Sequence, residues 1–316
     1  METVCKVCGK DFSSLKSLHG HLKAHKLVLM EYYPIYFPRK NLLTGDQIPF
    51  KNYEQYFSTE FSNRSQMEKW LGLQPQEISE KYCIDKLKQR IEKKNMEYAP
   101  CHIDLQTSKM PSLDHYKSYC GSYKNACDKV GLKQRFTKPI PKDFFNSLPN
   151  KKIICDTREQ LPIKFENFVI MKLDFGDYAL FGEDYNYIFV DRKAEGDFKG
   201  SFGKDINRVK RELDRVREFG GYIFFLVENS IRQIKANNAS GPTFKRSQGM
   251  ENIFFNTRSV MNEYGDVCQI LFVNGRKEMS EMIQRLLVYG PKLKSVDVQY
   301  FLDKHYELDS RISEQA

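Results

Sequence analysis

Two stretches of the sequence decide the fold of its C-terminal half: Gly176-Asp-Tyr178 and Val190-Asp-Arg-Lys193. Asp191 and Lys193 are two residues apart in a predicted strand, so both side chains project from the same face. Asp177 opens the preceding predicted strand, directly after a glycine that permits a tight turn. We therefore expect two carboxylates and one ammonium group to converge from adjacent strands.

Alternating strands and helices are predicted around these two stretches. The predicted strands are Ile153–Thr157, Val169–Leu173, Tyr178–Phe181, Tyr187–Asp191, Tyr222–Glu228 and Cys268–Val273. Helices are predicted at Asp205–Phe219 and Lys277–Leu287, and the stretch Ala236–Gly249, rich in Asn, Ser and Gly, predicts a mobile loop. Such alternation favours an α/β domain built on a mixed sheet.

The converging side chains suit phosphodiester hydrolysis. That reaction requires a divalent cation held by hard carboxylate oxygens, and a second positive group near the attacking water. Asp177 and Asp191 supply the carboxylates, and Lys193 supplies the positive group. We therefore expect Mg²⁺ (or Mn²⁺) as the cofactor of this site.

The same region resembles the nuclease domain of the XPF/Mus family, a branch of the PD-(D/E)XK nucleases. That family carries a Val-Asp-x-Arg-Glu-like strand, then Gly-Asp, then Glu-Arg-Lys-x-x-x-Asp. The matching residues are Asp156, Arg158, Glu159, Asp177, Asp191, Arg192, Lys193 and Asp197. The resemblance implies a restriction-endonuclease-like mixed sheet flanked by helices, an Mg-dependent endodeoxyribonuclease activity and homodimerisation through this domain.

The resemblance also implies roles for individual residues. Asp177 and Asp191 would ligate the metal and Lys193 would position the attacking water, with Asp156 and Glu159 as further catalytic carboxylates. Arg158, Arg192 and Asp197 would orient these groups or contact DNA. Asp191 stands where the family usually has glutamate, which would shift the metal by about one bond length. The chain after the last predicted helix is too short for the tandem helix–hairpin–helix module of that family, so targeting would come from the N-terminal half.

Basic side chains follow the site along the next predicted helix: Lys204, Arg208, Lys210, Arg211, Arg215 and Arg217. Glu212, Asp214 and Glu218 alternate with them and allow ordinary ion pairs within a helix. The basic residues either form a solvated face or follow a phosphate backbone.

The first 26 residues carry a metal-ligand pattern. Cys5-x-x-Cys8 is followed, after twelve residues, by His21-x-x-x-His25, a ligand set for tetrahedral zinc. This segment resembles the two-cysteine two-histidine zinc finger, which implies a ββα fold stabilised by Zn²⁺. Phe12 and Leu18 lie where such a finger needs its small core.

The contacts of the finger are less specific than its metal site. By resemblance, the base-reading positions fall on Ser14, Ser17 and Gly20, none of which can make a bidentate base contact. The lysines able to hold phosphates are Lys10, Lys16 and Lys23. The finger is therefore either an auxiliary DNA clamp or a protein-binding knob.

A second short string resembles the helical repeat found beside the catalytic domains of homing endonucleases. Its residues are Met110-Pro-Ser112, Tyr116, Cys120-Gly-Ser-Tyr123, Ala126 and Val130-Gly-Leu132, with Cys120 and Tyr123 in place of the usual aromatic pair. Ser112 and Ser122 can each cap a helix, and Gly131 can end the second one. The resulting module would bind DNA through Lys117 and Lys124; a helical spacer with a solvated basic face is the alternative.

The 316 residues divide into six predicted segments. These are a zinc finger (1–26), an irregular and helical connector (27–95), the helical repeat (96–135), a linker (136–150), the nuclease domain (151–290) and a C-terminal tail (291–316). A net charge of +9 favours a polyanionic partner. No apolar run approaches the ~18 residues of a membrane span, and no signal-peptide pattern is present. We therefore expect an intracellular, soluble protein with DNA as its partner.

These features together predict a metal-dependent DNA endonuclease of the homing type, which cuts double-stranded DNA at a long site. A structure-specific repair or recombination nuclease acting on flap or branched DNA is the first alternative. A DNA-binding regulator with an inactive nuclease fold is the second.

Overall fold

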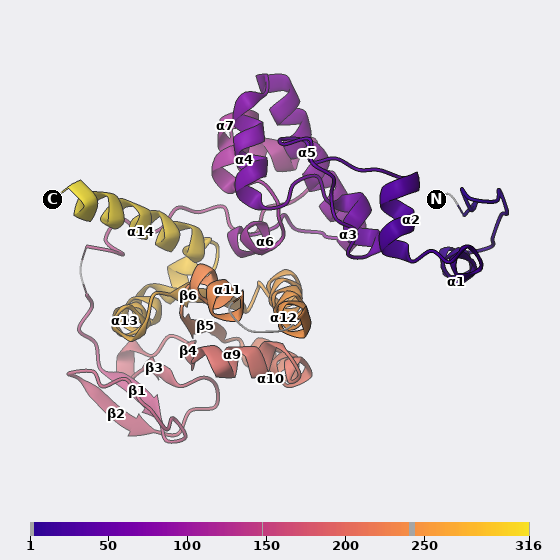
Figure 1. The fold of residues 1–316 in the computed structure, drawn as a ribbon. Coiled ribbons are helices and arrows are strands. Elements are labelled where there is room, and N and C mark those ends of the chain that lie inside the picture. Colours follow the sequence, from indigo (N-terminus) through magenta and orange to yellow (C-terminus); the bar gives the residue numbers. More distant parts are fainter. Residues whose placement is uncertain (1–2, 147, 240–243, 316) are drawn as a thin grey trace. The chain divides into compact units, whose positions relative to one another are not determined.

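The computed structural model describes residues 3–146, 148–239 and 244–315. The chain forms two compact units, and each is described by itself (Figure 1). The first comprises Met1–Lys88 and Lys109–Ala126, and the second comprises Gln89–Ser108 and Cys127–Ala316. The boundary between the units therefore falls inside the segment predicted as a helical repeat.

The second unit is built on a six-stranded sheet in the order β2-β1-β3-β4-β5-β6. The strands are β1 (Ile153–Asp156), β2 (Phe168–Met171), β3 (Tyr178–Leu180), β4 (Ile188–Lys193), β5 (Tyr222–Glu228) and β6 (Cys268–Val273). Strand β3 is antiparallel to both of its neighbours, whereas β1 pairs in parallel with β2, and β4, β5 and β6 pair in parallel. The predicted mixed sheet is confirmed.

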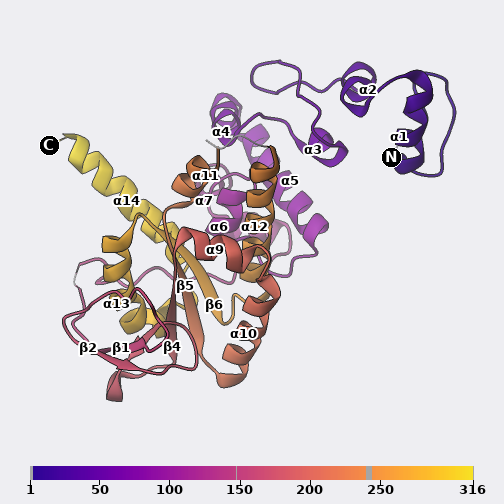
Figure 2. The ribbon, with the colours of Figure 1, turned by 60° about the horizontal axis from the view of Figure 1, so that its bottom comes forward.

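Helices cover both faces of this sheet (Figure 2). The first face carries α6 (His102–Thr107), α9 (Glu195–Phe202), α10 (Ile206–Phe219), α11 (Ile231–Ala239) and α12 (Phe244–Glu263), and the second carries α13 (Arg276–Leu293) and α14 (Val298–Gln315). Alternate residues of β5 feed the two cores: Ile223 and Phe225 face the first, and Phe224 and Leu226 the second. The predicted α/β class is confirmed.

The segment 291–316, which the sequence analysis predicts as a tail, contains helix α14. Val298 and Leu302 are fully buried in the second core. The side chain of Gln299 accepts a hydrogen bond from the backbone of Phe272 at 2.7 Å and donates one to it at 3.2 Å. Because this helix buries apolar residues and pairs with the edge strand β6, it is part of the domain.

The loop predicted over Ala236–Gly249 is largely helical. Helix α11 continues to Ala239 and α12 begins at Phe244, while residues 240–243 lie outside the described part of the chain. Ile234 and Met250 are buried in the first core. Their burial explains why a polar stretch with little periodicity still forms helices.

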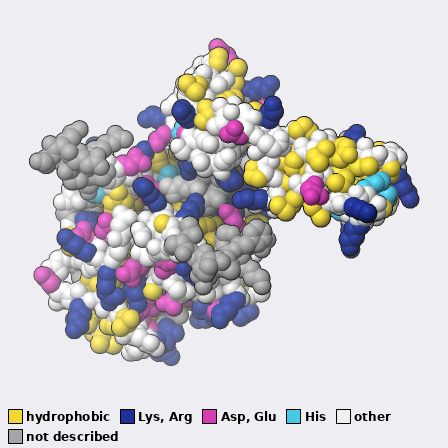
Figure 3. Space-filling model, viewed as in Figure 1, with side chains coloured by type: hydrophobic (Ala, Val, Ile, Leu, Met, Phe, Trp, Pro, Cys, Tyr) yellow, Lys and Arg dark blue, Asp and Glu magenta, His cyan; other side chains and the backbone are white. Residues whose placement is uncertain are grey.

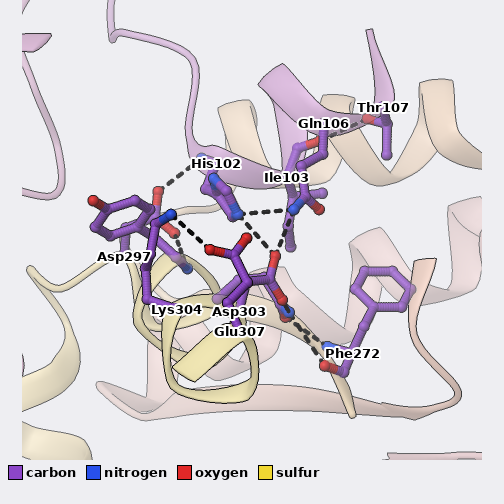
Figure 4. Close-up of polar contacts among 11 residues, drawn as sticks. His102, Ile103, Gln106, Thr107, Phe272, Asp297, Asp303, Lys304 and Glu307 are labelled. Atoms are coloured by element: carbon purple, nitrogen blue, oxygen red, sulfur yellow. Dashed lines mark hydrogen bonds and ion pairs between the residues drawn. The ribbon is translucent and has the colours of Figure 1, made fainter. Parts of the chain in front are cut away.

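A polar network joins α6 to α14 (Figure 4). His102 Nε2 lies 2.8 Å from Asp303 Oδ2, and the backbone N–H of His102 donates to Asp297 Oδ2 at 2.7 Å. Gln106 Nε2 donates to the same Asp303 oxygen at 2.5 Å. Residues near position 100 are therefore held by residues near position 300.

The first unit is helical in the residues that are described. It contains α1 (Leu15–His21), a 3₁₀ turn (Leu22–His25), α2 (Leu29–Tyr36), α3 (Tyr53–Ser58), α4 (Arg64–Leu73) and α7 (Leu113–Cys120), with parts of α5 (Gln76–Lys94) and α8 (Tyr123–Lys129). Ser112 Oγ accepts from the His115 N–H at 3.3 Å, and Ser122 Oγ accepts from the Asn125 N–H at 2.9 Å. Both predicted caps are present. No helix in the described ranges is long and apolar enough to cross a membrane.

Candidate active site and zinc centre

Gly176 allows the chain before β3 to approach β4 closely. Its φ is +62°, and a Cβ at this position would lie 3.0 Å from the carbonyl oxygen of Val190. The N–H of Asp177 donates to that same oxygen at 2.9 Å. The N–H of Arg192 in turn donates to Asp177 Oδ2 at 2.8 Å. The Gly-Asp pair thus fixes one carboxylate against the end of β4.

Asp191 and Lys193 occupy the end of β4. Lys193 Nζ lies 2.5 Å from Asp191 Oδ1, and only 13% and 8% of the two side chains are exposed. Asp191 Oδ1 is buried, and the Lys193 ammonium is its charged partner. The convergence predicted from the sequence is present.

The electrostatics of the three groups are strongly coupled. Burial and the neighbouring Asp191 carboxylate raise the pKa of Asp177 to about 8. Burial alone would lower the pKa of Lys193, but the carboxylates of Asp191 and Asp177 outweigh it and raise that pKa. Lys193 is therefore a proton-bearing cation, whereas Asp177 holds a proton because a second anion cannot easily be accommodated there.

This donor set fits a hard divalent cation. A cation would replace the proton on Asp177 and would lie beside the buried Asp191 carboxylate, which already faces the Lys193 ammonium. Mg²⁺ typically uses one or two carboxylates and fills its other positions with water or substrate phosphate. Within the described ranges, no third His, Cys, Asp or Glu joins this pair in a group of possible metal ligands.

Asp156 braces the site. Its Oδ1 accepts from the backbone N–H of Arg158 at 2.8 Å and from Arg158 Nε at 2.6 Å. Its Oδ2 accepts from the N–H of Leu173 at 2.5 Å. Burial acts to raise the pKa of Asp156, but these bonds from Arg158 and Leu173 outweigh it and lower the pKa. Both carboxylate oxygens of Asp156 therefore already accept hydrogen bonds.

Glu159 and Arg192 meet in an ion pair beside the site. Arg192 Nη2 lies 3.0 Å from Glu159 Oε1, with exposed side-chain fractions of 7% and 8%. Arg192 Nη1 lies 3.8 Å from Glu228 Oε2 at the end of β5. The sequence analysis did not include Glu228, which lies far from the motif along the chain. Arg192 thus links the end of β4 to Glu159, which follows β1, and to Glu228 at the end of β5.

Helix α10 adds a carboxylate that the sequence analysis assigned to ordinary ion pairs. Glu212 keeps only 21% of its side chain exposed, and its ion pair with Arg208 is long, at 3.9 Å. Burial and the charge of Asp191 raise the pKa of Glu212. In the sequence, Glu212 lies next to the buried apolar positions Val209 and Val216 of this helix. That position could have indicated that its side chain is partly buried.

Some of the basic side chains are paired with acidic side chains from other elements. Lys210 lies 2.5 Å from Glu263, and Arg217 forms a two-pronged pair with Asp266 at 2.7 and 2.8 Å. The predicted DNA-contacting side chains that are exposed are Arg158, Lys204, Arg208, Arg211, Lys117 and Lys124, and Asp197 is exposed in the first turn of α9. On the face in Figure 3, Lys and Arg lie interspersed with Asp and Glu over the second unit. Some basic side chains of α10 are therefore neutralised by acidic side chains of the same unit.

The N-terminal ligands form a compact cluster. One ligand atom from each of Cys5, Cys8, His21 and His25 lies within 4.8 Å of the other three. Cys8 Sγ is 3.3 Å from His21 Nε2, and the His21 and His25 Nε2 atoms are 3.0 Å apart. Two sulfur and two nitrogen donors at this separation fit tetrahedral Zn²⁺.

The finger differs from the predicted ββα form in its first part. No strand is assigned in residues 3–14, where the Cys5 N–H bonds the Lys10 oxygen at 2.9 Å and the Gly9 N–H bonds the Cys5 oxygen at 2.7 Å. The segment between the two cysteines is so short that these two turn hydrogen bonds form in place of the paired hydrogen bonds between two strands. Leu18 is 1% exposed, and Phe12 packs on His21 with ring centroids 4.7 Å apart.

Comparison with known proteins identifies this segment. Residues 2–26 match the family of C2H2-type zinc fingers. The N-terminal segment is a C2H2-type zinc finger. No curated protein matches the chain.

Two solved structures resemble part of the chain. XPF from Aeropyrum pernix in complex with DNA is 21% identical with a TM-score of 0.34, covering 45% of this chain and 66% of that one. XPF from Aeropyrum pernix is 20% identical with a TM-score of 0.32, covering 43% and 64% respectively. The chain thus spans just under two thirds of each.

Proposed function

We propose that the second unit is a metal-dependent DNA endonuclease that hydrolyses phosphodiester bonds. One observation carries the proposal: the buried carboxyl groups of Asp177 and Asp191 come together beside the Lys193 ammonium, where β3 begins and β4 ends. When bound to the two aspartates, Mg²⁺ or Mn²⁺ would neutralise charge on a phosphate and acidify a water.

The side chains of the chain itself have separate tasks in this proposal. Asp177 and Asp191 hold the cation. Lys193 keeps its proton because two carboxylates raise its pKa, so it donates to the attacking water or to a phosphate oxygen. Arg158 lies two residues after Asp156, Arg208 lies on α10, and both side chains are exposed. These two guanidinium groups would hold phosphates that flank the cleaved bond.

DNA is favoured as the substrate by the zinc finger in the same chain and by the exposed basic residues of both units. The helical repeat is proposed to contact the duplex through Lys117 and Lys124. We propose site-directed cleavage of a long duplex sequence, with flap or branched DNA as the alternative substrate. Homodimerisation through the second unit would allow both strands to be cut.

The test is a plasmid-nicking assay in Mg²⁺ with the zinc-loaded full chain. Asp191→Asn and Lys193→Met should each lower the cleavage rate by about 100-fold or more, because each removes one charge from the site. Asp214→Asn is the matched control, since Asp214 lies on exposed α10 surface with 52% of its side chain accessible. Equal rates for the parent, Asp191→Asn and Lys193→Met would overturn the proposal.

Substrate choice needs a second experiment. The parent is incubated with a random duplex library and, separately, with a flap substrate of the same composition. Enriched cut sites in the library would support site-directed cleavage, and cutting at the junction alone would support the structure-specific alternative. Binding of either DNA without cleavage would favour the inactive regulator.

A further inference from the structure

The zinc finger does not end as a structural element at its last ligand. Cys5, Leu18 and Leu22 share one buried cluster with side chains from the following segment. The partners from that segment are Tyr32, Tyr33, Ile48, Phe50 and Tyr56, each at most 5% exposed. The core of the finger therefore continues into α2 and α3.

Two tyrosine hydroxyls from α2 form hydrogen bonds with residues next to the zinc ligands in the sequence. Tyr32 accepts a hydrogen bond from the N–H of Lys6, inside the Cys5-x-x-Cys8 turn, at 2.9 Å. The Tyr33 hydroxyl lies 2.7 Å from Nε2 of His19, which precedes the ligand His21 on α1. Both halves of the ligand set are thus braced from outside the matched segment.

The bracing tyrosines are themselves held rigidly. Tyr33 stacks on Phe50 with ring centroids 4.8 Å apart and an interplanar angle of 4°. The hydroxyl of Tyr56 donates to the Phe37 oxygen at 2.8 Å and accepts from the Arg39 N–H at 3.1 Å. These bonds close the loop between α2 and α3 around the cluster.

Neither side of this cluster has enough material to fold alone. Helix α2 has 8 residues and α3 has 6, both shorter than the ~12–15 residues at which isolated helices become even marginally stable. A finger of this size depends on metal for its stability. Because the two share one core, the metal supports both.

We propose that residues 3–58 fold as a single zinc-dependent unit, with Tyr32 as a positioning residue for the Cys5–Cys8 turn. In this unit, the side of the finger that carries Leu18 and Leu22 is covered by the aromatic residues of α2 and α3. Its opposite side remains open, since Ser14, Ser17 and Gly20 are exposed.

The first test measures zinc affinity of the full chain by competition with a chromophoric chelator. Tyr32→Phe removes only the hydroxyl that holds the Lys6 N–H and should weaken zinc binding about tenfold, as for other groups that orient metal ligands. Tyr36→Phe is the matched control, because Tyr36 is on the same helix and 37% exposed. Equal affinities for Tyr32→Phe and Tyr36→Phe would overturn the positioning role.

The second test follows amide hydrogen exchange of the unmutated full chain before and after zinc removal. We expect Leu29–Tyr36 and Tyr53–Ser58 to lose protection together with Leu15–His21, while β5 and β6 keep theirs. Retained protection of α2 and α3 without zinc would overturn the single-unit proposal. Neither result bears on the nuclease proposal, which the Asp191 and Lys193 variants test separately.

Discussion

At the scale of single residues, the candidate active site depends on one backbone position. Gly176 has a left-handed conformation, and the space where a side chain would begin is occupied by the Val190 carbonyl. This close approach lets the Asp177 N–H bond β4 and places its carboxylate near Asp191. The glycine is as necessary to the acidic pair as the acids themselves.

Replacing this glycine tests that dependence. Gly176→Ala should lower the free energy of unfolding by about 1–3 kcal/mol, because it combines an unfavourable φ with a 3.0 Å contact to backbone. The midpoint of urea unfolding and the nicking rate are the measurements, and both should fall. Gly196→Ala, in α9 with no atom within 4 Å of the added Cβ, should be neutral or slightly stabilising. Equal losses in the two variants would contradict the argument.

The shifted carboxyl gives a pH dependence of stability without bound Mg²⁺. Burial and Asp191 raise the pKa of Asp177 from its ordinary 3.8 to about 8, so the folded chain binds more protons than the unfolded chain between these values. The stability due to this proton is complete below about pH 4 and is lost as the pH rises towards 8. Asp177→Asn stays neutral, so its free energy of unfolding should rise relative to that of the parent as the pH increases from about 4 to 8, with no further change above that range. Urea unfolding of zinc-loaded protein measures this, and parallel profiles would refute it.

At the scale of elements, α14 shows how a polar contact can define a domain. Asp303 accepts hydrogen bonds from Gln106 and Gln299 at 2.5 and 2.7 Å and pairs with His102. Helices α6 and α14 come from distant parts of the sequence, and this carboxylate lies between them. The helix therefore docks through specific bonds as well as through buried Val298 and Leu302.

Removing that carboxylate should loosen the helix pair. Asp303→Ala removes the carboxylate that pairs with His102 and accepts from Gln106, and one of the two acceptors of Gln299, and should cost about 2–3 kcal/mol of unfolding free energy. Asp184→Ala, which removes an exposed aspartate with one surface ion pair to Lys151, should cost less than about 1 kcal/mol. Urea unfolding compares the two variants, and a cost no larger for Asp303→Ala would show that the network is dispensable.

The elements also show where sequence patterns succeed. The predicted bounds of β5 and β6 match the structure, because both strands are mostly apolar and are buried on both faces. Helix α14 was not predicted because charged residues and the paired Gln299 obscure its apolar positions. Helices α2 and α3 lie in the segment predicted as an irregular and helical connector, where their positions were not predicted because packing around Tyr33 and Tyr56 rather than periodicity stabilises them.

At the scale of the whole molecule, local motifs predicted which side chains lie together better than they predicted how the chain divides into units. The zinc ligands, Asp177, Asp191 and Lys193 follow from spacing within short stretches. Glu212 and Glu228 approach the site from other elements, and only the tertiary fold brings them there. The division into units likewise depends on contacts between distant segments, which no local pattern encodes.

The bond between His102 and Asp303 has a consequence for synthesis of the chain on the ribosome. Its partners are 201 positions apart, and those of the neighbouring Asp297 bond are 195 apart. Translation must therefore add nearly two hundred residues before helix α6 can find its acceptors. Until then the nascent polypeptide exposes that helix, so we expect chaperones to bind it during synthesis. A premature stop codon before Asp297 would likewise leave α6 without these hydrogen-bond partners.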